Sequence, residues 1–515
     1  MASYRPHYHV SVPFGWANDP NGTVYYRGKA HLFFQHYPHK PEWGPMHWYH
    51  VTTEDFVHWD HRPVALCPDQ PYERVCGCCS GSTIEKDGRL WLMYTAAQPM
   101  MQRQCMAVSD DGDRFVKDPS NPILTAEMLS PEIYEEDFRD PRLFRHGDAF
   151  YLIAGIRYLD GGRRVEPAPA CQRETTNPRQ PDPAHKKEGW GNLCLLRSDD
   201  LFHWSYVGHL LHPQPEFSED FYRLDGVYEC PDYFVTDSGA EVLLTSPQNL
   251  PQSGHLFQNI HSVLFMLGRL DFETGRFDVQ TIGEVDSGFD FYAAQTLRMP
   301  DGRVVMIAWK EMWDRSFPTR AEEWAGTYTL PRELTVAGDR LIQKPVREIM
   351  AFRRNTVRAG EAAVADGEVS LPGVSGNVIE LRFTLAPGDA ARAGVKLFCD
   401  GEHETLLYYD RAEGLLIFDR TNAGVALTGR EPDVNRRVCP LGPRDSIEFD
   451  LFLDVCSLEA FIDGGRHTMT GNVYPDPDAA LGIRFFAEGG RAVFRDIEKH
   501  DIAAGAPVAG EGFGA

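Results

Sequence analysis

A turn–strand–strand unit recurs five times in the first two thirds of the chain. In each copy a glycine turn leads into a short apolar strand and then a second strand, as in RGKAHLFFQ with HWYHVTTEDFVHW. The turn glycines are separated by 60, 59, 92 and 63 residues; they are Gly28, Gly88, Gly147, Gly239 and Gly302. A single unit would leave an apolar face exposed, and radial stacking of five units buries these faces. We therefore predict an all-β chain that begins with a five-bladed β-propeller, since a plain sandwich of unrelated strands would not explain the recurring order.

The repeat stops after LIQKPVREI, at residues 341–349. From about Asn377 onward, alternating strands such as VIELRFTL, LLIFDR and SLEAFID are separated by Gly and Asp turns, which is typical of a β-sandwich. A chain of 515 residues also exceeds the size at which one hydrophobic core stops growing. We therefore predict two domains: a catalytic propeller at 1–350 and a C-terminal β-sandwich at 351–515.

The net charge of the chain limits the kinds of partner that it can bind. Lys and Arg number 51 and Asp and Glu 75, for a net charge of −24, which disfavours nucleic acid and anionic membranes as partners and favours a neutral ligand. The chain shows no secretory leader or membrane span, so we expect a cytoplasmic protein. Its 11 cysteines fit reduced thiols, and Cys76, Cys78 and Cys79 fit small buried thiols better than a metal site. We expect no metal and no cofactor.

Three acids stand out because of their position in the repeat. Asp19 in WANDPNG, Asp140 in FRDPRLF and Glu229 in YECPDYF each stand where the inner strand of a blade is about to begin. Most lone carboxylates in turns are capping or solvated groups, but inner strands of a propeller surround its axis, so these three should converge at one end of the central channel. Cleavage of a glycoside needs one ionised and one protonated carboxyl group. The third can hold sugar hydroxyls and favour the transition state.

The motifs around these acids resemble those of glycoside hydrolase family 32, which contains invertases, inulinases and sucrose-6-phosphate hydrolases. The resemblance covers nearly the whole chain and includes, in the order of the family, WANDPNG, LFFQHYP, WGPMHW, CSGS, FRDP, ECPD, DFYAAQ and LPREL. The family is known for a five-bladed propeller followed by a β-sandwich, in agreement with the repeats. The resemblance implies Asp19 as nucleophile, Glu229 as general acid and then base, and Asp140 as the group that grips fructosyl hydroxyls.

The resemblance also implies a sugar pocket. Cys230, beside Glu229, could donate a weak hydrogen bond to the site or be a buried structural thiol. For the polar pocket residues the alternative is turn capping, and for the two tryptophans it is core packing. The positions at which the family places sugar-contacting groups are Asn18, Gln35, Trp43, Ser80, Arg139, Tyr292 and Trp309.

Some positions depart from the family pattern. Cys79 replaces a usual aromatic residue, Tyr49 a usual glycine, and Lys310 to Trp313 the common Gly-Trp-Met form. The 92-residue separation reflects an insertion at about 158–189 that joins the second and third strands of its blade, and we expect it to rim the mouth of the site. Its basic residues could recognise a phosphate or carboxylate on the leaving group, or simply be solvated; they are Arg163, Arg164, Arg173, Arg179, Lys186 and Lys187.

Taken with the resemblance, these features predict a retaining glycoside hydrolase that releases fructose from sucrose, sucrose 6-phosphate or short fructo-oligosaccharides through a covalent fructosyl-enzyme. Its partner would be a small sugar. Three other functions stay open: a fructosyltransferase, a pentosidase on the same fold, and a non-catalytic carbohydrate-binding relative. The sandwich domain could stabilise the propeller, extend the cleft or mediate a homodimer.

Overall fold

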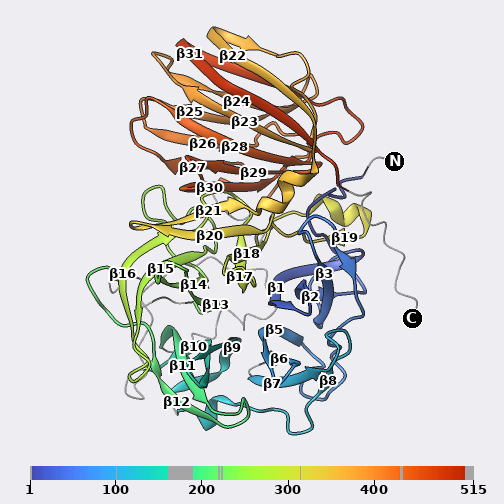
Figure 1. The fold of residues 1–515 in the computed structure, drawn as a ribbon, viewed down its shortest axis with the longest axis vertical. Coiled ribbons are helices and arrows are strands. Elements are labelled where there is room, and N and C mark those ends of the chain that lie inside the picture. Colours follow the sequence, from blue (N-terminus) through green and yellow to red (C-terminus); the bar gives the residue numbers. More distant parts are fainter. Residues whose placement is uncertain are drawn as a thin grey trace.

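The computed structural model describes residues 3–504 except 100, 131, 160–188, 218–220, 222, 223, 225, 314 and 430–432. The named elements of this part are β-strands and a few short 3-10 turns. Figure 1 shows five small sheets arranged around a centre, with a second β-body beside them. The predicted all-β fold, a five-bladed propeller followed by a β-sandwich, is confirmed.

Each blade has four antiparallel strands, the first of which lies nearest the propeller axis (Figure 1), and blade I also contains a fifth, parallel strand. Blades I and II are formed by β1 (Gly15–Tyr26), β2 (Lys29–Tyr37), β3 (His47–Thr53) and β4 (Asp60–His61), and by β5 (Gly77–Lys86), β6 (Arg89–Gln98), β7 (Met101–Ser109) and β8 (Val116–Lys117). Blade III consists of β9 (Ile133–His146), β10 (Ala149–Tyr158), β11 (Trp190–Ser198) and β12 (Trp204–His209). Blades IV and V are formed by β13 (Tyr228–Val235), β14 (Glu241–Pro247), β15 (Leu264–Leu270) and β16 (Phe277–Glu284), and by β17 (Tyr292–Arg298), β18 (Val304–Trp309), β20 (Arg332–Ala337) and β21 (Arg340–Pro345).

The repeating glycines lie in the turns between the first and second strands of the blades. All five have a positive φ, of 88°, 74°, 59°, 83° and 91° in chain order, which glycine adopts without steric cost. This confirms the repeat read from the sequence. The long separation arises between β10 and β11, the second and third strands of blade III, as predicted; residues 160–188, which hold its basic side chains, lie outside the described part of the chain.

A short strand from late in the propeller closes the ring. Strand β19 (Trp324–Ala325), between β18 and β20 in the chain, pairs in parallel with the start of β1, with Gly15 opposite Trp324 and Trp16 opposite Ala325. Blade I therefore contains the first strand and a late strand of the propeller. The start of WANDPNG is therefore paired with a strand from near the end of the propeller, which joins the two ends of the domain.

The innermost strand of every blade contains one extra residue at the corresponding level. Such a β-bulge turns side chains away from the regular alternation of a strand. The three acids therefore lie within the first strands, at or beside bulges, and not before these strands as the sequence suggested. Asp140 and Cys230 have positive φ values of 61° and 45° as a result. The five register shifts lie between Ala17 and Pro20, Cys79 and Gly81, Arg139 and Arg142, Glu229 and Asp232, and Tyr292 and Gln295.

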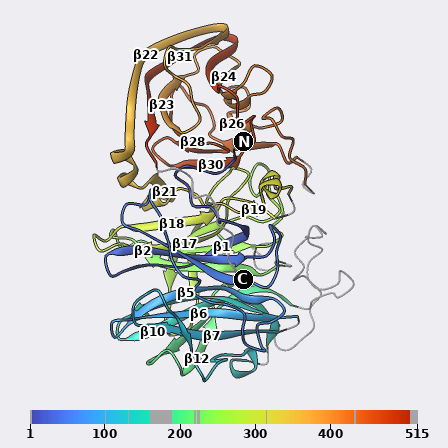
Figure 2. The same ribbon diagram turned by 90° about the vertical axis from the view of Figure 1, so that its right-hand side faces the viewer.

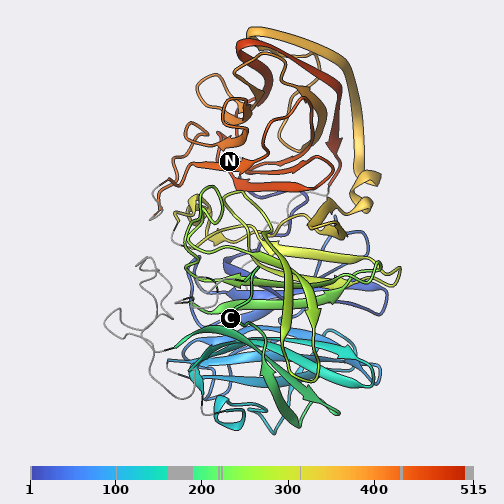
Figure 3. The same cartoon turned by 90° about the vertical axis from the view of Figure 1, so that its left-hand side faces the viewer.

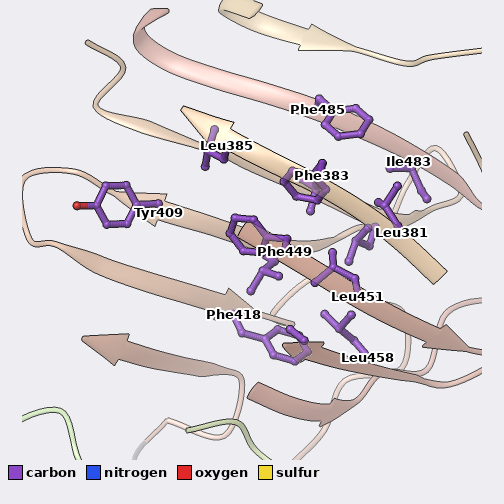
Figure 4. Close-up of a cluster of buried hydrophobic side chains, with 14 of the residues drawn as sticks. Leu381, Phe383, Leu385, Tyr409, Phe418, Phe449, Leu451, Leu458, Ile483 and Phe485 are labelled. Carbon is purple, nitrogen blue, oxygen red and sulfur yellow. The ribbon is translucent and has the colours of Figure 1, made fainter. Parts of the chain in front are cut away.

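The C-terminal body is built around one very long strand. Strand β31 (Gly482–Ile502) pairs along its length with β22 (Arg353–Val369), and its two halves pair on the other side with β24 and with β23. The array therefore folds over a core that Figure 4 shows in part, with Leu381, Phe383, Phe449 and Phe485 pointing toward one another. The remaining strands are β23 (Ile379–Ala386), β24 (Arg392–Cys399), β25 (Thr405–Asp410), β26 (Leu415–Asp419), β27 (Arg436–Pro440), β28 (Ile447–Asp454), β29 (Ser457–Ile462) and β30 (His467–Asn472).

Strand β22 begins earlier than the alternating strands visible in the sequence. Its residues are mostly exposed, and its composition, RRNTVRAGEAAVADGEV, lacks the apolar alternation that marks a half-buried strand. Pairing with β31, and not its own pattern, makes it a strand.

The two bodies lie against each other (Figures 2 and 3), and a buried charged network joins them. Arg332 of LPREL is fully buried and binds Asp286 at 3.0 Å and Glu459 at 2.6 Å. His9 lies between Glu459 and Asp454, at 2.8 Å from each. Buried charges persist only when paired in this way, so the sandwich is fastened to the propeller by ionic contacts as well as apolar ones.

The described part of the chain also gives the state of the cysteines, of metal-ligating groups and of apolar helices. Ten cysteines fall within it and all ten are free, including the buried Cys76, Cys78 and Cys79. Among the described residues, no group of three or more His, Cys, Asp or Glu side chains is arranged so that it could hold a metal ion. No helix in the described ranges is long and apolar enough to cross a membrane.

Candidate active site

Asp19 is held by three side-chain donors. Asn18 and Asp19 together form the bulge opposite Gln35, and Asp19 is 7% exposed. Its Oδ1 accepts a hydrogen bond from Asn18 Nδ2 at 3.0 Å, and its Oδ2 accepts from Gln35 Nε2 at 2.8 Å and Ser80 Oγ at 2.5 Å. Hydrogen bonds donated to a carboxylate favour its ionised form. This arrangement suits an acid that must attack as an anion.

The orientation of Asn18 is itself enforced. Trp16 Nε1 donates to Asn18 Oδ1 at 2.9 Å, which turns the amide nitrogen toward Asp19. The Trp16 ring packs edge-on against Trp309 at 5.9 Å and Phe317 at 5.0 Å. Trp309 has no exposed surface, so its position matches the core-packing alternative; its contact with a sugar stays a prediction.

Cys230 lies between two of the acids. Its backbone N–H donates to Asp140 Oδ2 at 3.0 Å, and its Sγ is 3.7 Å from Asp19 Oδ2 and 3.8 Å from Asp140 Oδ2. Burial raises the pKa of this thiol well above its usual value, so it remains protonated and can act only as a weak donor to the carboxylates. One residue therefore joins the acids of blades I, III and IV.

Asp140 is only 4% exposed, and two other carboxyl groups, those of Glu229 and Asp19, lie near it. Burial and the charge of Glu229 raise the pKa of Asp140 to about 7, although Arg139 opposes this shift. Closely spaced carboxyl groups share protons, and their titration belongs to the group as a whole. The cluster therefore retains a proton well above the pH at which an isolated Asp loses it.

Glu229 is held on both oxygens. Arg139 Nε donates to its Oε1 at 3.0 Å, and Tyr292 Oη lies 2.7 Å from its Oε2 and 2.9 Å from the carbonyl oxygen of Ser246. The single phenolic hydrogen can go to Glu229 when that group is ionised, or to Ser246 when Glu229 is protonated and donates to the phenol oxygen. Both protonation states of Glu229 are therefore accommodated, as an acid that later becomes a base requires.

The structure adds residues that the motifs did not single out. Arg139 Nη1 donates to Asp137 Oδ1 at 2.9 Å, and Asp137 Oδ2 accepts from Arg157 Nε at 2.9 Å. Asp137 precedes Arg139 by two positions on β9 and so shares its face, which is a signal present in the sequence. Arg157 could not be found in this way, because only the pairing of β10 with β9 brings it near. Thr95 also enters the site, where its Oγ1 accepts from the Asp140 N–H at 3.0 Å.

The positions that depart from the family pattern have local explanations. Cys79 packs with Cys76 and Ala97 against the half-buried Trp43, so it forms part of the wall behind that ring. Tyr49 is buried and lies 2.9 Å from His61 Nδ1 through its hydroxyl. Lys310 donates through Nζ to Ser457 of the sandwich at 2.7 Å, which fastens the segment after Trp309 to the second body.

Comparison with known proteins places the chain in a class. Residues 9–163 and 183–345 match the profile of the glycosyl hydrolases family 32 N-terminal domain, and residues 348–501 match that of the family 32 C-terminal domain. The chain belongs to glycosyl hydrolase family 32. It is accordingly a β-fructofuranosidase-type glycoside hydrolase, and fructoside hydrolysis is the activity its relatives support.

Individual relatives match along almost the whole chain. A sucrose-6-phosphate hydrolase of Zymomonas mobilis is 34% identical over 513 residues, which span 97% of this chain and 92% of the relative. The structure of a sucrose-6-phosphate hydrolase from Lactobacillus gasseri is 27% identical, with a TM-score of 0.79 over 97% of this chain and 93% of that one. A variant of a Bombyx mori family 32 β-fructofuranosidase, in complex with sucrose, is 28% identical, with a TM-score of 0.77 over 98% and 95% of the two chains.

Proposed function

We propose that this protein releases fructose from small β-fructosides by double displacement, with Asp19 as nucleophile, Glu229 as general acid and base, and Asp140 as the group that grips fructosyl hydroxyls. One observation carries the proposal: the three acids converge at the bulges of three innermost strands. Cys230 and Arg139 link these acids to one another. Family membership supports it independently.

The two steps use the two carboxyl groups in turn. In the first, the Asp19 carboxylate attacks C2 of the fructosyl unit, the bond from C2 to the leaving oxygen breaks, and Glu229 gives its proton to that oxygen. In the second, Glu229 takes a proton from water, the water oxygen bonds to C2, and the ester to Asp19 breaks. Asp140 accepts hydrogen bonds from sugar hydroxyls throughout and stabilises the transition state.

The surrounding residues have two kinds of proposed role. Asn18, Gln35 and Ser80 keep Asp19 ionised and oriented, while Arg139 and Tyr292 hold Glu229. We also propose that the exposed edges of these groups, with Trp43, contact the sugar. Retention predicts Asp19 and Glu229 carboxyl groups about 5 to 5.5 Å apart, since a longer gap would admit a water and invert the product.

For the substrate, we propose sucrose, sucrose 6-phosphate and short fructo-oligosaccharides. Relatives that span nearly the whole chain carry the name sucrose-6-phosphate hydrolase, and another, from Escherichia coli, that of raffinose invertase. A cytoplasmic location, a small sugar as the partner, the lack of nucleic acid or membrane partners and a homodimer stay predictions.

The test is a product assay across sucrose, sucrose 6-phosphate, kestose, inulin and levan, with Asp19→Ala as the inactive variant. We expect fructose from the short substrates, with the β-anomer formed first in a time-resolved NMR spectrum. Turnover that survives Asp19→Ala would refute the nucleophile, and an initial α-anomer would refute retention. Transfer of fructose to sugar at high sucrose, or cleavage of arabinosides alone, would favour a fructosyltransferase or a pentosidase.

A further inference from the structure

A row of alternating buried charges leads away from Glu229. Glu229 contacts Arg139, Arg139 contacts Asp137, and Asp137 contacts Arg157, with separations of 3.0, 2.9 and 2.9 Å. Asp137, Arg139 and Arg157 are only 2%, 6% and 3% exposed. Buried ions are costly unless their partners are well placed, so each member of the row constrains the next.

The far end of the row is anchored to the backbone. Arg157 Nη1 donates to the carbonyl oxygen of Gly189 at 3.2 Å, immediately before β11 begins. Gly189 has a φ of 76°, and a Cβ at this position would lie 2.2 Å from the carbonyl oxygen of Tyr158. This close approach admits only glycine, so Arg157 is anchored where two backbone segments lie close together.

Asp137 constrains the guanidinium of Arg139 from behind. Arg139 uses Nη1 for Asp137 and Nε for Glu229, so the planar group is held by carboxylates on two edges. Without Asp137, the guanidinium could turn toward Asp140, whose Oδ2 is already 4.0 Å from Nε. The second arginine in turn keeps Asp137 ionised and in place.

We propose that Asp137 and Arg157 are positioning residues for Glu229, which orient Arg139 against its Oε1 and set the balance of charge around it. This inference rests on the proposed acid/base role of Glu229. Neither residue touches the reacting atoms in this scheme. Both act through Arg139.

The proposal predicts opposite effects on the pH profile. The charged or titratable groups that face Glu229 come from four blades; they are Asp19, Arg139, Asp140, Cys230 and Tyr292. A unit charge about 7 Å from a carboxyl group, at an effective dielectric constant of about 20, shifts its titration by roughly one to two pH units. Asp137→Asn removes a negative charge and favours ionised Glu229, whereas Arg157→Met removes a positive charge and favours protonated Glu229.

The experiment compares pH profiles of kcat and kcat/KM for sucrose hydrolysis. The basic limb, which reports the acid, should move down by about one pH unit in Asp137→Asn and up by about half a unit in Arg157→Met. In the double variant, whose net charge is unchanged, the limb should return close to the wild-type position, but kcat should be lower than in the wild type because Arg139 has lost the carboxylate that orients it. Glu380→Gln, which removes a buried partner of Arg353 in the sandwich, is the control and should leave the limb in place.

The outcomes separate this inference from the proposed function. Shifts in the same direction in both single variants, or no shift, would overturn the positioning role. Failure of all three variants to fold would overturn it as well, because the pair would then serve folding and not protonation. Glu229→Gln should abolish the basic limb; if the limb persists in that variant, the acid/base assignment fails, whatever Asp137 and Arg157 do.

Discussion

Ser80→Ala tests whether the donors around Asp19 serve to keep that group ionised. Ser80 Oγ lies 2.5 Å from Asp19 Oδ2 and is fully buried, so the bond is shielded from water. A hydrogen bond to a charged group contributes about 1.5 to 3 kcal/mol, which corresponds to roughly one to two pH units. Because Asn18 and Gln35 keep their bonds, we expect the lower end of this range.

The expected result is a shift of the acidic limb of kcat/KM to higher pH by about one unit, since removal of a donor weakens the ionised form. At the wild-type midpoint of that limb, activity should fall about fivefold from this cause alone. The assay is initial-rate hydrolysis of sucrose across the pH range. Ser109→Ala is the control, because Ser109 is equally buried in the same blade and donates to Asp111 at 2.9 Å, away from the acids.

An acidic limb that stays in place would refute this reasoning. If kcat/KM fell uniformly at all pH values, Ser80 would act by contacting the sugar and not by holding Asp19 ionised. If Ser109→Ala moved the limb as well, the shift would reflect a general loss of rigidity in blade II.

Three further predictions concern buried charges. Burial and Glu229 raise the pKa of Asp140 to about 7, so above that pH its ionised form destabilises the folded state. Asp140→Asn should therefore abolish hydrolysis yet stabilise the fold by about 1 to 3 kcal/mol above pH 7. A lower melting temperature of the variant at that pH would contradict this. Arg332→Met leaves Asp286 and Glu459 without their cation and should cost about 3 to 5 kcal/mol in urea denaturation; a loss below about 1 kcal/mol would show that the network is dispensable. Burial alone would raise the pKa of Glu459, but Arg332 and His9 outweigh it and lower that pKa to about 2, so the free energy of unfolding should fall as pH drops from about 4.3 to about 2; a flat profile in that window, measured by denaturation at each pH, would contradict the assignment.

The division into domains at residue 350 stays a prediction. Strand β21 ends at Pro345, a 3-10 turn covers Arg347–Phe352, and β22 begins at Arg353. The buried contacts of Arg332 and His9 across the two bodies indicate that a propeller expressed alone would lose its charge partners in the sandwich.

Much of the architecture could be predicted from the sequence, because turns and strand repeats depend on residues that are close together in the chain. Gly28 and its four counterparts mark turns that need a positive φ, and a repeat that cannot bury its apolar face alone implies radial stacking. Asp19, Asp140 and Glu229 could be selected because the same place in three repeats must face one axis. Strand β22 could not be predicted, because its exposed residues show no apolar alternation.

Only the tertiary structure decided how the acids are held. The bulge that turns each innermost strand appears as a shift in pairing and not as a residue pattern, so Asp19, Asp140 and Glu229 occupy three different positions around it. Arg157 reaches Asp137 through strand pairing. The sequence by itself determined which chemical groups surround the axis, because periodicity is a local property; their hydrogen bonds and charge balance arose from contacts between distant blades, which no local pattern encodes.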